Sequence, residues 1–347
     1  MPEGEQSVLV VGPSWVGDMV MSQVLYIYLK QIRPGVSIDV LAPAWSNPLL
    51  KRMPQVRRAI TMPLGHGQLG LSGRWRLGRE LRSRHYDQAI LLPNSFKSAL
   101  VPFFAGVRRR TGWRGEHRFG LLNDIRTLDK KALPLMAQRF MALGHSSGDC
   151  LPATLPSPSI EANTQRAKML LDKFHMASDR PILALCPGSE FGSAKRWPVA
   201  YFAQLGEHYL QRGWQLALLG SSNDQVIASQ ISERLIHNSA SFNLAGQTQL
   251  DEVIDLLSRA HAVVSNDSGL MHIAAALGIP LAVIYGPTSA GFTPPLSDSA
   301  ATIASDIDCA PCFAKECPLG HHACMQSIDV ERVVRELDSL VAAREGP

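Results

Sequence analysis

The segment SNDSGLMHIAAALG (265–278) combines residue types that can bind a phosphate group at the start of a helix. Asp267 and Ser268 can cap a helix that begins near Gly269, and the positive end of such a helix attracts anions. His272 lies one turn inside this helix, on the same face as Ser268. A single helical histidine is more often structural than functional, but this one follows a buried strand and a polar helix start. The pattern therefore favours a diphosphate site at Ser268, Gly269 and His272.

A second loop suited to phosphate binding is CPGSEFGSAKRWP (186–198), between a strand-like run and a helix that Pro198 marks. Its glycines and serines, among them Ser189, give a flexible polar loop, and Lys195 and Arg196 add two cations. Backbone N–H groups beside a cation suit a phosphate or a diphosphate. The alternative is a solvated Lys–Arg pair, but the length and position of the loop favour phosphate binding.

Asp18 is the carboxylate that we single out in the loop GPSWVGDM (12–19), directly after the first strand-like run. Gly12 and Gly17 permit a tight turn, and Asp18 falls where a helix is expected to start. Two interpretations stay open: an N-cap, which stabilises a helix by roughly 1 kcal/mol, or a general base. The glycine spacing is not G-x-G-x-x-G, which argues against a nicotinamide enzyme.

Polar and basic residues also gather in the N-terminal half. LPNSFKSALVPFFAG (92–106) places Asn94, Ser95 and Lys97 just after a strand, and RRRTGWRGEHR (108–118) is cationic. Residues 1–158 hold 21 Lys and Arg against 10 Asp and Glu, whereas residues 159–347 hold 13 against 20. The basic half suggests an anionic partner. No nucleic-acid module is recognisable, so we expect a phosphorylated acceptor and no nucleic acid.

Four of the six cysteines lie in one C-terminal segment, CAPCFAKECPLGHHACM (309–325). Thiolates at this spacing can hold zinc or an iron–sulfur cluster, with a structural and not a catalytic role. The spacing lacks the two separated pairs of a zinc ribbon, and reduced thiols remain the alternative. The cysteines concerned are Cys309, Cys312, Cys317 and Cys324.

The elements that must position these loops alternate between strands and helices, which predicts parallel sheets with crossover helices. The expected strands span about 7–12, 37–41, 87–93, 181–188, 214–220, 262–267 and 280–286. The expected helices span about 18–31, 76–86, 162–174, 199–212, 249–260, 268–277 and 329–344. The fold class is therefore α/β, with two Rossmann-like doubly wound domains facing a central cleft.

The uncharged, proline-rich stretch LPATLPSPS (151–159) is typical of a linker. We expect an N-terminal domain at 1–155, a second domain at 156–328, and a final helix at 329–347 that packs back across them. The chain is 46% hydrophobic and 18% charged, as in folded soluble proteins. It has no apolar run of the roughly 18 to 20 residues that a membrane span needs, nor a secretory signal, so we expect a cytoplasmic protein.

Six motifs together resemble the lipopolysaccharide core heptosyltransferases, and most closely their type II branch. In chain order they are GPSWVGDMVMSQ, LPNSFKSALVPFFAG, RTGWRGE, PGSEFGSAKRWP, NLAGQT and SNDSGLMH. The resemblance covers nearly the whole chain and implies a GT-B fold. It also implies a first domain that binds the acceptor and a second that binds ADP-heptose. The implied acceptor is a lipid-linked, phosphorylated inner core, so peripheral contact with the inner face of the inner membrane is expected.

The resemblance also assigns roles by position. Asp18 would be the general base of a single inverting displacement that needs no cofactor. ADP-heptose would be bound by Ser189, Lys195, Asp267, Ser268, Gly269 and His272. The acceptor would be bound by Asn94, Ser95, Lys97 and Arg114. The role of Glu190, which follows Ser189 where type I relatives tend to have two threonines, is left open.

Three other functions compete with this assignment. A type I or type III heptosyltransferase would use the same donor with a different acceptor. A nucleotide-sugar binding protein would lack catalysis, and a metal-binding protein would be built around the cysteine segment.

Overall fold

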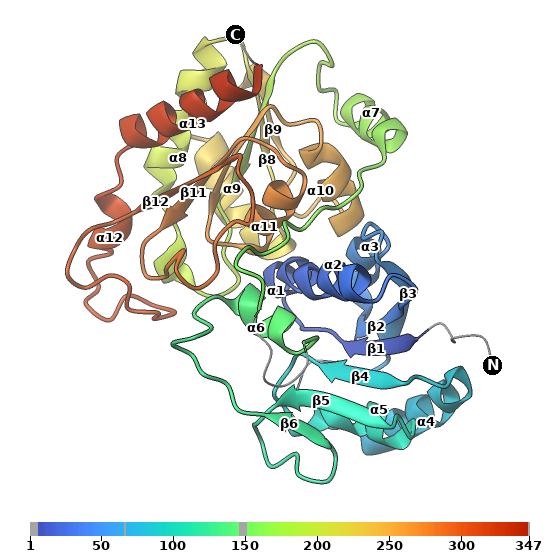
Figure 1. The fold of residues 1–347 in the computed structure, drawn as a ribbon. Helices are drawn as coiled ribbons and strands as arrows, with labels where there is room; N and C mark the ends of the chain where they lie inside the picture. Colours follow the sequence, from blue (N-terminus) through green and yellow to red (C-terminus); the bar gives the residue numbers. More distant parts are fainter. Residues whose placement is uncertain (1–5, 66, 146–150, 346–347) are drawn as a thin grey trace. The chain divides into compact units, whose positions relative to one another are not determined.

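The structure is a computed structural model that describes residues 6–65, 67–145 and 151–345. The chain divides into two compact units, residues 1–158 and 159–347. Each unit is a parallel six-stranded sheet with helices packed on it (Figure 1). The predicted α/β class, with two doubly wound domains, is confirmed. Among the described residues, no helix is long and apolar enough to span a membrane.

The sheet of the first unit has the strand order β3-β2-β1-β4-β5-β6. Strand β1 pairs in parallel with β2 on one side and with β4 on the other, so that Val10 lies opposite Val40 and Ile90. The strands are β1 (Ser7–Val11), β2 (Ser37–Pro43), β3 (Val56–Met62), β4 (Gln88–Leu91), β5 (Arg109–Trp113) and β6 (Asp124–Arg126). The helices are α1 (Val16–Met21), α2 (Gln23–Ile32), α3 (Asn47–Leu50), α4 (Leu71–Leu81), α5 (Leu100–Phe104) and α6 (Met136–Ala142).

The sheet of the second unit has the order β12-β11-β10-β7-β8-β9. The strands are β7 (Ile182–Cys186), β8 (Gln215–Leu218), β9 (Ser241–Asn243), β10 (Ala262–Asn266), β11 (Leu281–Tyr285) and β12 (Ala300–Ala304). The helices are α7 (Thr164–Lys173), α8 (Val199–Gln211), α9 (Gln225–Ser232), α10 (Leu250–Leu257), α11 (Gly269–Ala276), α12 (Ala323–Gln326) and α13 (Val330–Glu345). The final helix, α13, packs against α8, β11 and β12 of this unit.

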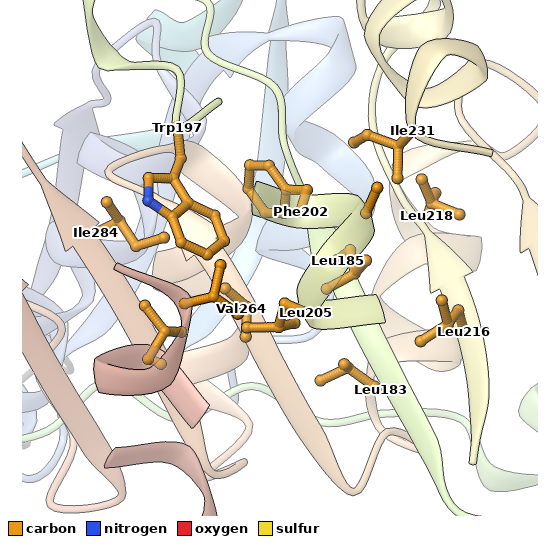
Figure 2. Packing of buried hydrophobic residues seen from close by; sticks show 14 of the residues in the cluster. Leu183, Leu185, Trp197, Phe202, Leu205, Leu216, Leu218, Ile231, Val264 and Ile284 are labelled. Atoms are coloured by element: carbon orange, nitrogen blue, oxygen red, sulfur yellow. The ribbon is translucent and has the colours of Figure 1, made fainter. Parts of the chain in front are cut away.

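The core of the second unit fixes the start of α8 (Figure 2). Trp197 is fully buried, with its ring 5.0 Å from that of Phe202 in an edge-to-face contact. Its indole Nε1 donates to the carbonyl of Ile328 at 2.9 Å. Fully burying an apolar side chain stabilises a fold by roughly 1.5–3 kcal/mol. Trp197 therefore holds the end of the 186–198 loop firmly against the sheet.

Two expected helices of the first unit differ from the structure. The helix expected at 76–86 is α4, which spans Leu71–Leu81 and so begins and ends five residues earlier. The helix expected at 18–31 is two helices, α1 and α2, which meet at Ser22. The hydroxyl of Ser22 donates to the carbonyl of Met19 at 2.7 Å, a local bond that competes with helix continuation. The N-cap of α1 is Trp15, so Asp18 lies in the first turn and the N-cap interpretation of Asp18 is wrong.

Candidate active site

The loops of the second unit that the sequence predicts to bind phosphate share one edge of its sheet. β11, β10 and β7 are adjacent and parallel, so the loops that follow them leave from the same edge. In open α/β sheets ligands bind beyond this carboxyl edge. The segments 187–197 and 267–272, which the sequence singles out, therefore lie close together.

An ion pair links two of these loops. Lys195 Nζ lies 2.5 Å from Asp267 Oδ2 and 3.3 Å from the Asp267 carbonyl oxygen. Both side chains are largely buried, 12% and 6% exposed. Thr288, from the loop after β11, donates its hydroxyl to the same Oδ2 at 2.7 Å. Asp267 thus holds the Lys195 ammonium in place, and Thr288 helps to fix the carboxylate.

His272 lies on α11, within reach of the charges of this ion pair, and is 5% exposed. Burial lowers its pKa to about 4; the charge of Lys195 adds to this, and that of Asp267 opposes it. At neutral pH the imidazole is therefore uncharged. It can orient a ligand through a hydrogen bond, but it does not supply a positive charge.

The start of α11 supplies backbone donors to the same edge. Ser268 is the N-cap and Gly269 the first helical residue, as expected. The Ser268 side chain does not cap the helix; its hydroxyl lies 3.1 Å from that of Ser265. The first turn of an α-helix has N–H groups without intrahelical partners, and these suit a phosphate.

Ser189, a predicted donor-binding residue, lies in the loop that follows β7 at this edge. It is 6% exposed, and its hydroxyl has no hydrogen-bond partner among the described residues. A buried hydroxyl without a partner costs about 1–3 kcal/mol, which a ligand acceptor would relieve. Its neighbour Glu190, whose role the sequence leaves open, accepts weak hydrogen bonds from Ser221 and Asn223 at 3.3 and 3.4 Å.

The cysteine segment (309–325) packs against the loop 186–198, a contact that the sequence analysis did not predict. Ala194 N–H donates to the Lys315 carbonyl at 3.1 Å. A Cβ at Gly192 would lie 2.1 Å from that carbonyl oxygen. The ammonium groups of Lys195 and Lys315 lie 4.9 and 5.9 Å from the centre of the Phe191 ring. No local pattern marks Lys315, because its partner loop is distant in sequence.

The four cysteines of that segment are free thiols, with Cys324 buried and Cys312 exposed. In the described part of the chain, no group of three or more His, Cys, Asp or Glu side chains could hold a metal ion. As folded, Cys309, Cys312, Cys317 and Cys324 therefore do not form the ligand set that their spacing suggests.

In the first unit, Asp18 follows β1 and is half-buried in the first turn of α1. The loops 94–97 and 114–118 come together at the same sheet. The backbone N–H of Phe96 donates to Glu116 Oε2 at 2.6 Å, and a Cβ on Gly115 would lie 3.2 Å from Asn94. The proposed acceptor-binding residues Asn94, Ser95, Lys97 and Arg114 therefore belong to one pair of touching loops.

Arg118, which the sequence did not single out, fastens these loops. It is 2% exposed and donates to the carbonyls of Pro93 and Trp113 and to Asn94 Oδ1. Burial lowers the pKa of its guanidinium, and Glu116 opposes the shift. The cationic segment 108–118 thus contains a structural arginine, Arg118, and an exposed one, Arg114.

Comparison with known proteins supports one family. Residues 74–323 match the sequence model of glycosyltransferase family 9 (heptosyltransferase). Lipopolysaccharide heptosyltransferase 2 of Escherichia coli K12 is 47% identical over 97% of this chain and 99% of its own. Lipooligosaccharide heptosyltransferase 2 of Haemophilus ducreyi is also 47% identical, over 96% and 99%.

Solved structures agree with this assignment. The structure of E. coli ADP-heptose lps heptosyltransferase II aligns over 98% of this chain and 100% of its own, with a TM-score of 0.88 and 45% identity. E. coli heptosyltransferase WaaC with ADP shares the fold, with a TM-score of 0.71 and 19% identity over 96% of this chain and all of its own. The resemblance drawn from the six motifs is confirmed, and the chain belongs to glycosyltransferase family 9, the heptosyltransferases.

Proposed function

We propose that this protein is a type II heptosyltransferase. It transfers L-glycero-D-manno-heptose from ADP-heptose to the first heptose of the lipopolysaccharide inner core, with inversion at the anomeric carbon. The observation that carries the proposal is 47% identity over nearly the whole chain to relatives named heptosyltransferase 2. The carboxyl edge of the second sheet adds chemistry that suits such a donor.

The second unit binds the donor in this proposal. The ADP diphosphate is held by Lys195, the N-terminus of α11 and the unpartnered hydroxyl of Ser189. Asp267 orients Lys195, and neutral His272 donates or accepts a hydrogen bond. Because these groups are fixed before the reaction, they stabilise the charge that grows on the departing diphosphate. No cofactor takes part.

The first unit supplies the base and the acceptor site. Asp18 takes the proton from the acceptor hydroxyl as its oxygen attacks the anomeric carbon. The bond from that carbon to the ADP oxygen breaks in the same step, and its electron pair leaves with ADP. The acceptor is a lipid-linked, phosphorylated inner core bound by Asn94, Ser95, Lys97 and Arg114, at the inner face of the inner membrane. The excess of Lys and Arg in residues 1–158 supports an anionic acceptor.

One assay separates the specificities. Purified protein is given ADP-heptose and acceptors that carry no core heptose or one, and ADP release is measured. Type II specificity predicts rapid release with the one-heptose acceptor and a rate at least about tenfold lower with the heptose-free acceptor, since a missing sugar removes acceptor contacts. Equal rates, or preference for the heptose-free acceptor, would assign a sister specificity.

For the cysteine segment the proposal is a structural zinc or iron–sulfur centre without a catalytic role. Its support is the spacing of Cys309, Cys312, Cys317 and Cys324 and their position beside the phosphate loop. Binding would have to draw these thiols together. Metal analysis of protein purified without chelators tests this: near-stoichiometric zinc or iron is expected, and its absence from active enzyme removes the proposal.

A further inference from the structure

A cavity of about 470 Å³ lies in the second unit, beside the donor loops. It is bounded by the segment 193–199, by α9 and by the segment 322–326. The cavity is distinct from the proposed donor site, because its lining does not include Ser189, Lys195, Asp267 or His272. Its polar lining comes mainly from Arg196, Asn223, Gln230, His322 and Gln326.

Arg196 lines this cavity together with Trp197, whereas the preceding residue, Lys195, is turned toward Asp267. Lys195 pairs with Asp267. Trp197 is fixed through its backbone N–H, which donates to Asn266 Oδ1 at 3.1 Å, and through its buried indole. The backbone at Arg196 is extended, with φ −84° and ψ 118°. Successive side chains of an extended backbone point in opposite directions, so the adjacent cations of the AKRWP motif diverge.

The guanidinium of Arg196 has no anionic partner. No carboxylate lies within ion-pair distance of it among the described residues, and its Nε is buried without a hydrogen bond. No Asp or Glu lines the cavity. The carboxylate of Glu190 accepts from Asn223 Nδ2, not from Arg196. A half-buried cation with a buried N–H that no protein group accepts can gain a hydrogen bond and a charge partner from an anion.

The remaining walls indicate the size and character of that anion. Asn223, Gln230 and Gln326 offer side-chain amide donors, while Trp197, Ile227 and Met325 give apolar surface. The volume is in the range of small-molecule sites. Arginine binds carboxylates and phosphates through paired N–H groups.

We propose that this cavity is a second ligand site, which takes a small organic anion bearing a phosphate or carboxylate, with Arg196 as its charge partner. The site is separate from the donor site and does not depend on the proposed function.

Calorimetric titration of the ADP-saturated full chain tests the site, since ADP occupies the donor loops. Inorganic phosphate and citrate are the probes, which separate a phosphate preference from a carboxylate preference. We expect one of them to bind, and Arg196→Gln to weaken it at least about tenfold through loss of the bidentate contact. Arg335→Gln removes an exposed charge from α13 in the same unit and should change affinity less than about twofold.

Gln230→Glu is a second test that keeps Arg196. It places a carboxylate in the same cavity, and we expect it to abolish probe binding and to raise the melting temperature. Three outcomes overturn the proposal: neither probe binds the wild-type protein, Arg196→Gln binds as the wild type does, or Gln230→Glu leaves binding unchanged. If the chain fails to bind ADP, the donor assignment fails separately, and the same variants still test the cavity with phosphate alone.

Discussion

At the scale of single residues, the proposed donor site is a small set of paired charges near one neutral histidine. Lys195 is neutralised by Asp267, and Asp267 accepts from Thr288 as well. In the proposed function, the diphosphate would therefore meet a cation whose position is already fixed. Catalysis would then depend on the fixed position of Lys195 more than on net charge.

Replacing Asp18 by Asn tests the base. The amide keeps the size of the side chain but accepts protons poorly, so kcat should fall at least about 100-fold. The affinity for ADP, measured by calorimetry, should stay within about twofold, because the proposed donor groups lie in the second unit. Turnover near the wild-type rate would remove Asp18 from this role.

Replacing Thr288 by Val tests whether Asp267 needs a second donor. The change removes one hydrogen bond and keeps the shape, so Lys195 is held less firmly. We expect the KM for ADP-heptose to rise about three- to tenfold, the equivalent of one hydrogen bond. Thr302→Val, at an exposed position of β12, serves as the control. An unchanged KM would mean that Lys195 alone fixes Asp267.

His272 gives a pH prediction with a definite sign. The pKa of His272 is about 4 in the folded protein, compared with 6.5 for an unperturbed histidine in the unfolded chain. The unfolded chain therefore binds the proton more tightly. Stability is fully present above pH 6.5 and is lost as the pH falls toward 4, by about 3 kcal/mol at most. Urea unfolding of the wild type and His272→Gln between pH 7 and pH 4.5 measures this. Parallel pH profiles for the two proteins would contradict it.

At the scale of elements, the contact between the cysteine segment and the phosphate loop can be tested at Gly192. An added methyl group would meet the Lys315 carbonyl, so the Ala194–Lys315 hydrogen bond must break or lengthen. We expect Gly192→Ala to lower the free energy of unfolding by about 1–3 kcal/mol and to weaken ADP binding. Gly35→Ala, where nothing lies within 4 Å of the new methyl group, is the control. Equal effects of the two changes would argue against a bracing role.

Each strand that the sequence predicts has a neighbouring strand on both sides in its sheet. β1, β4, β7 and β10 are continuous buried runs, and apolar content alone identifies them. The sequence does not predict five of the strands. Four of them, β3, β6, β9 and β12, lie at the edges of the sheets, and the fifth is β5. Edge strands are partly solvated, so their sequences are short or mixed, as in VRRAITM of β3.

Local spacing could predict contacts of the candidate site only between residues that are close in sequence. Ser268, Gly269 and His272 share one helix, and their spacing alone places them together. Lys195 and Arg196 look equivalent in the sequence, yet one reaches Asp267 and the other lines a separate cavity. Thr288, Lys315 and Arg118 act through contacts with distant segments, which no local pattern reveals.

At the scale of the whole molecule, net charge differs between the two units that we propose to bind acceptor and donor. Residues 1–158 carry a net charge of +11 and residues 159–347 of −7, whereas the proposed donor cluster contains the paired Lys195 and Asp267. Long-range attraction should therefore act on the acceptor far more than on ADP-heptose.

Salt dependence tests this separation. The Debye length falls from about 10 Å at 0.1 M to about 3 Å at 1 M ionic strength, so added salt weakens attraction between the basic unit and a phosphorylated acceptor. Between 0.1 and 1 M NaCl we expect the KM for that acceptor to rise about fivefold or more, while the KM for ADP-heptose changes about twofold or less. A dephosphorylated acceptor should show the flatter response. If both acceptors respond alike, the excess of Lys and Arg in the first unit serves another partner, and the salt response of vesicle binding would then identify the membrane surface as that partner.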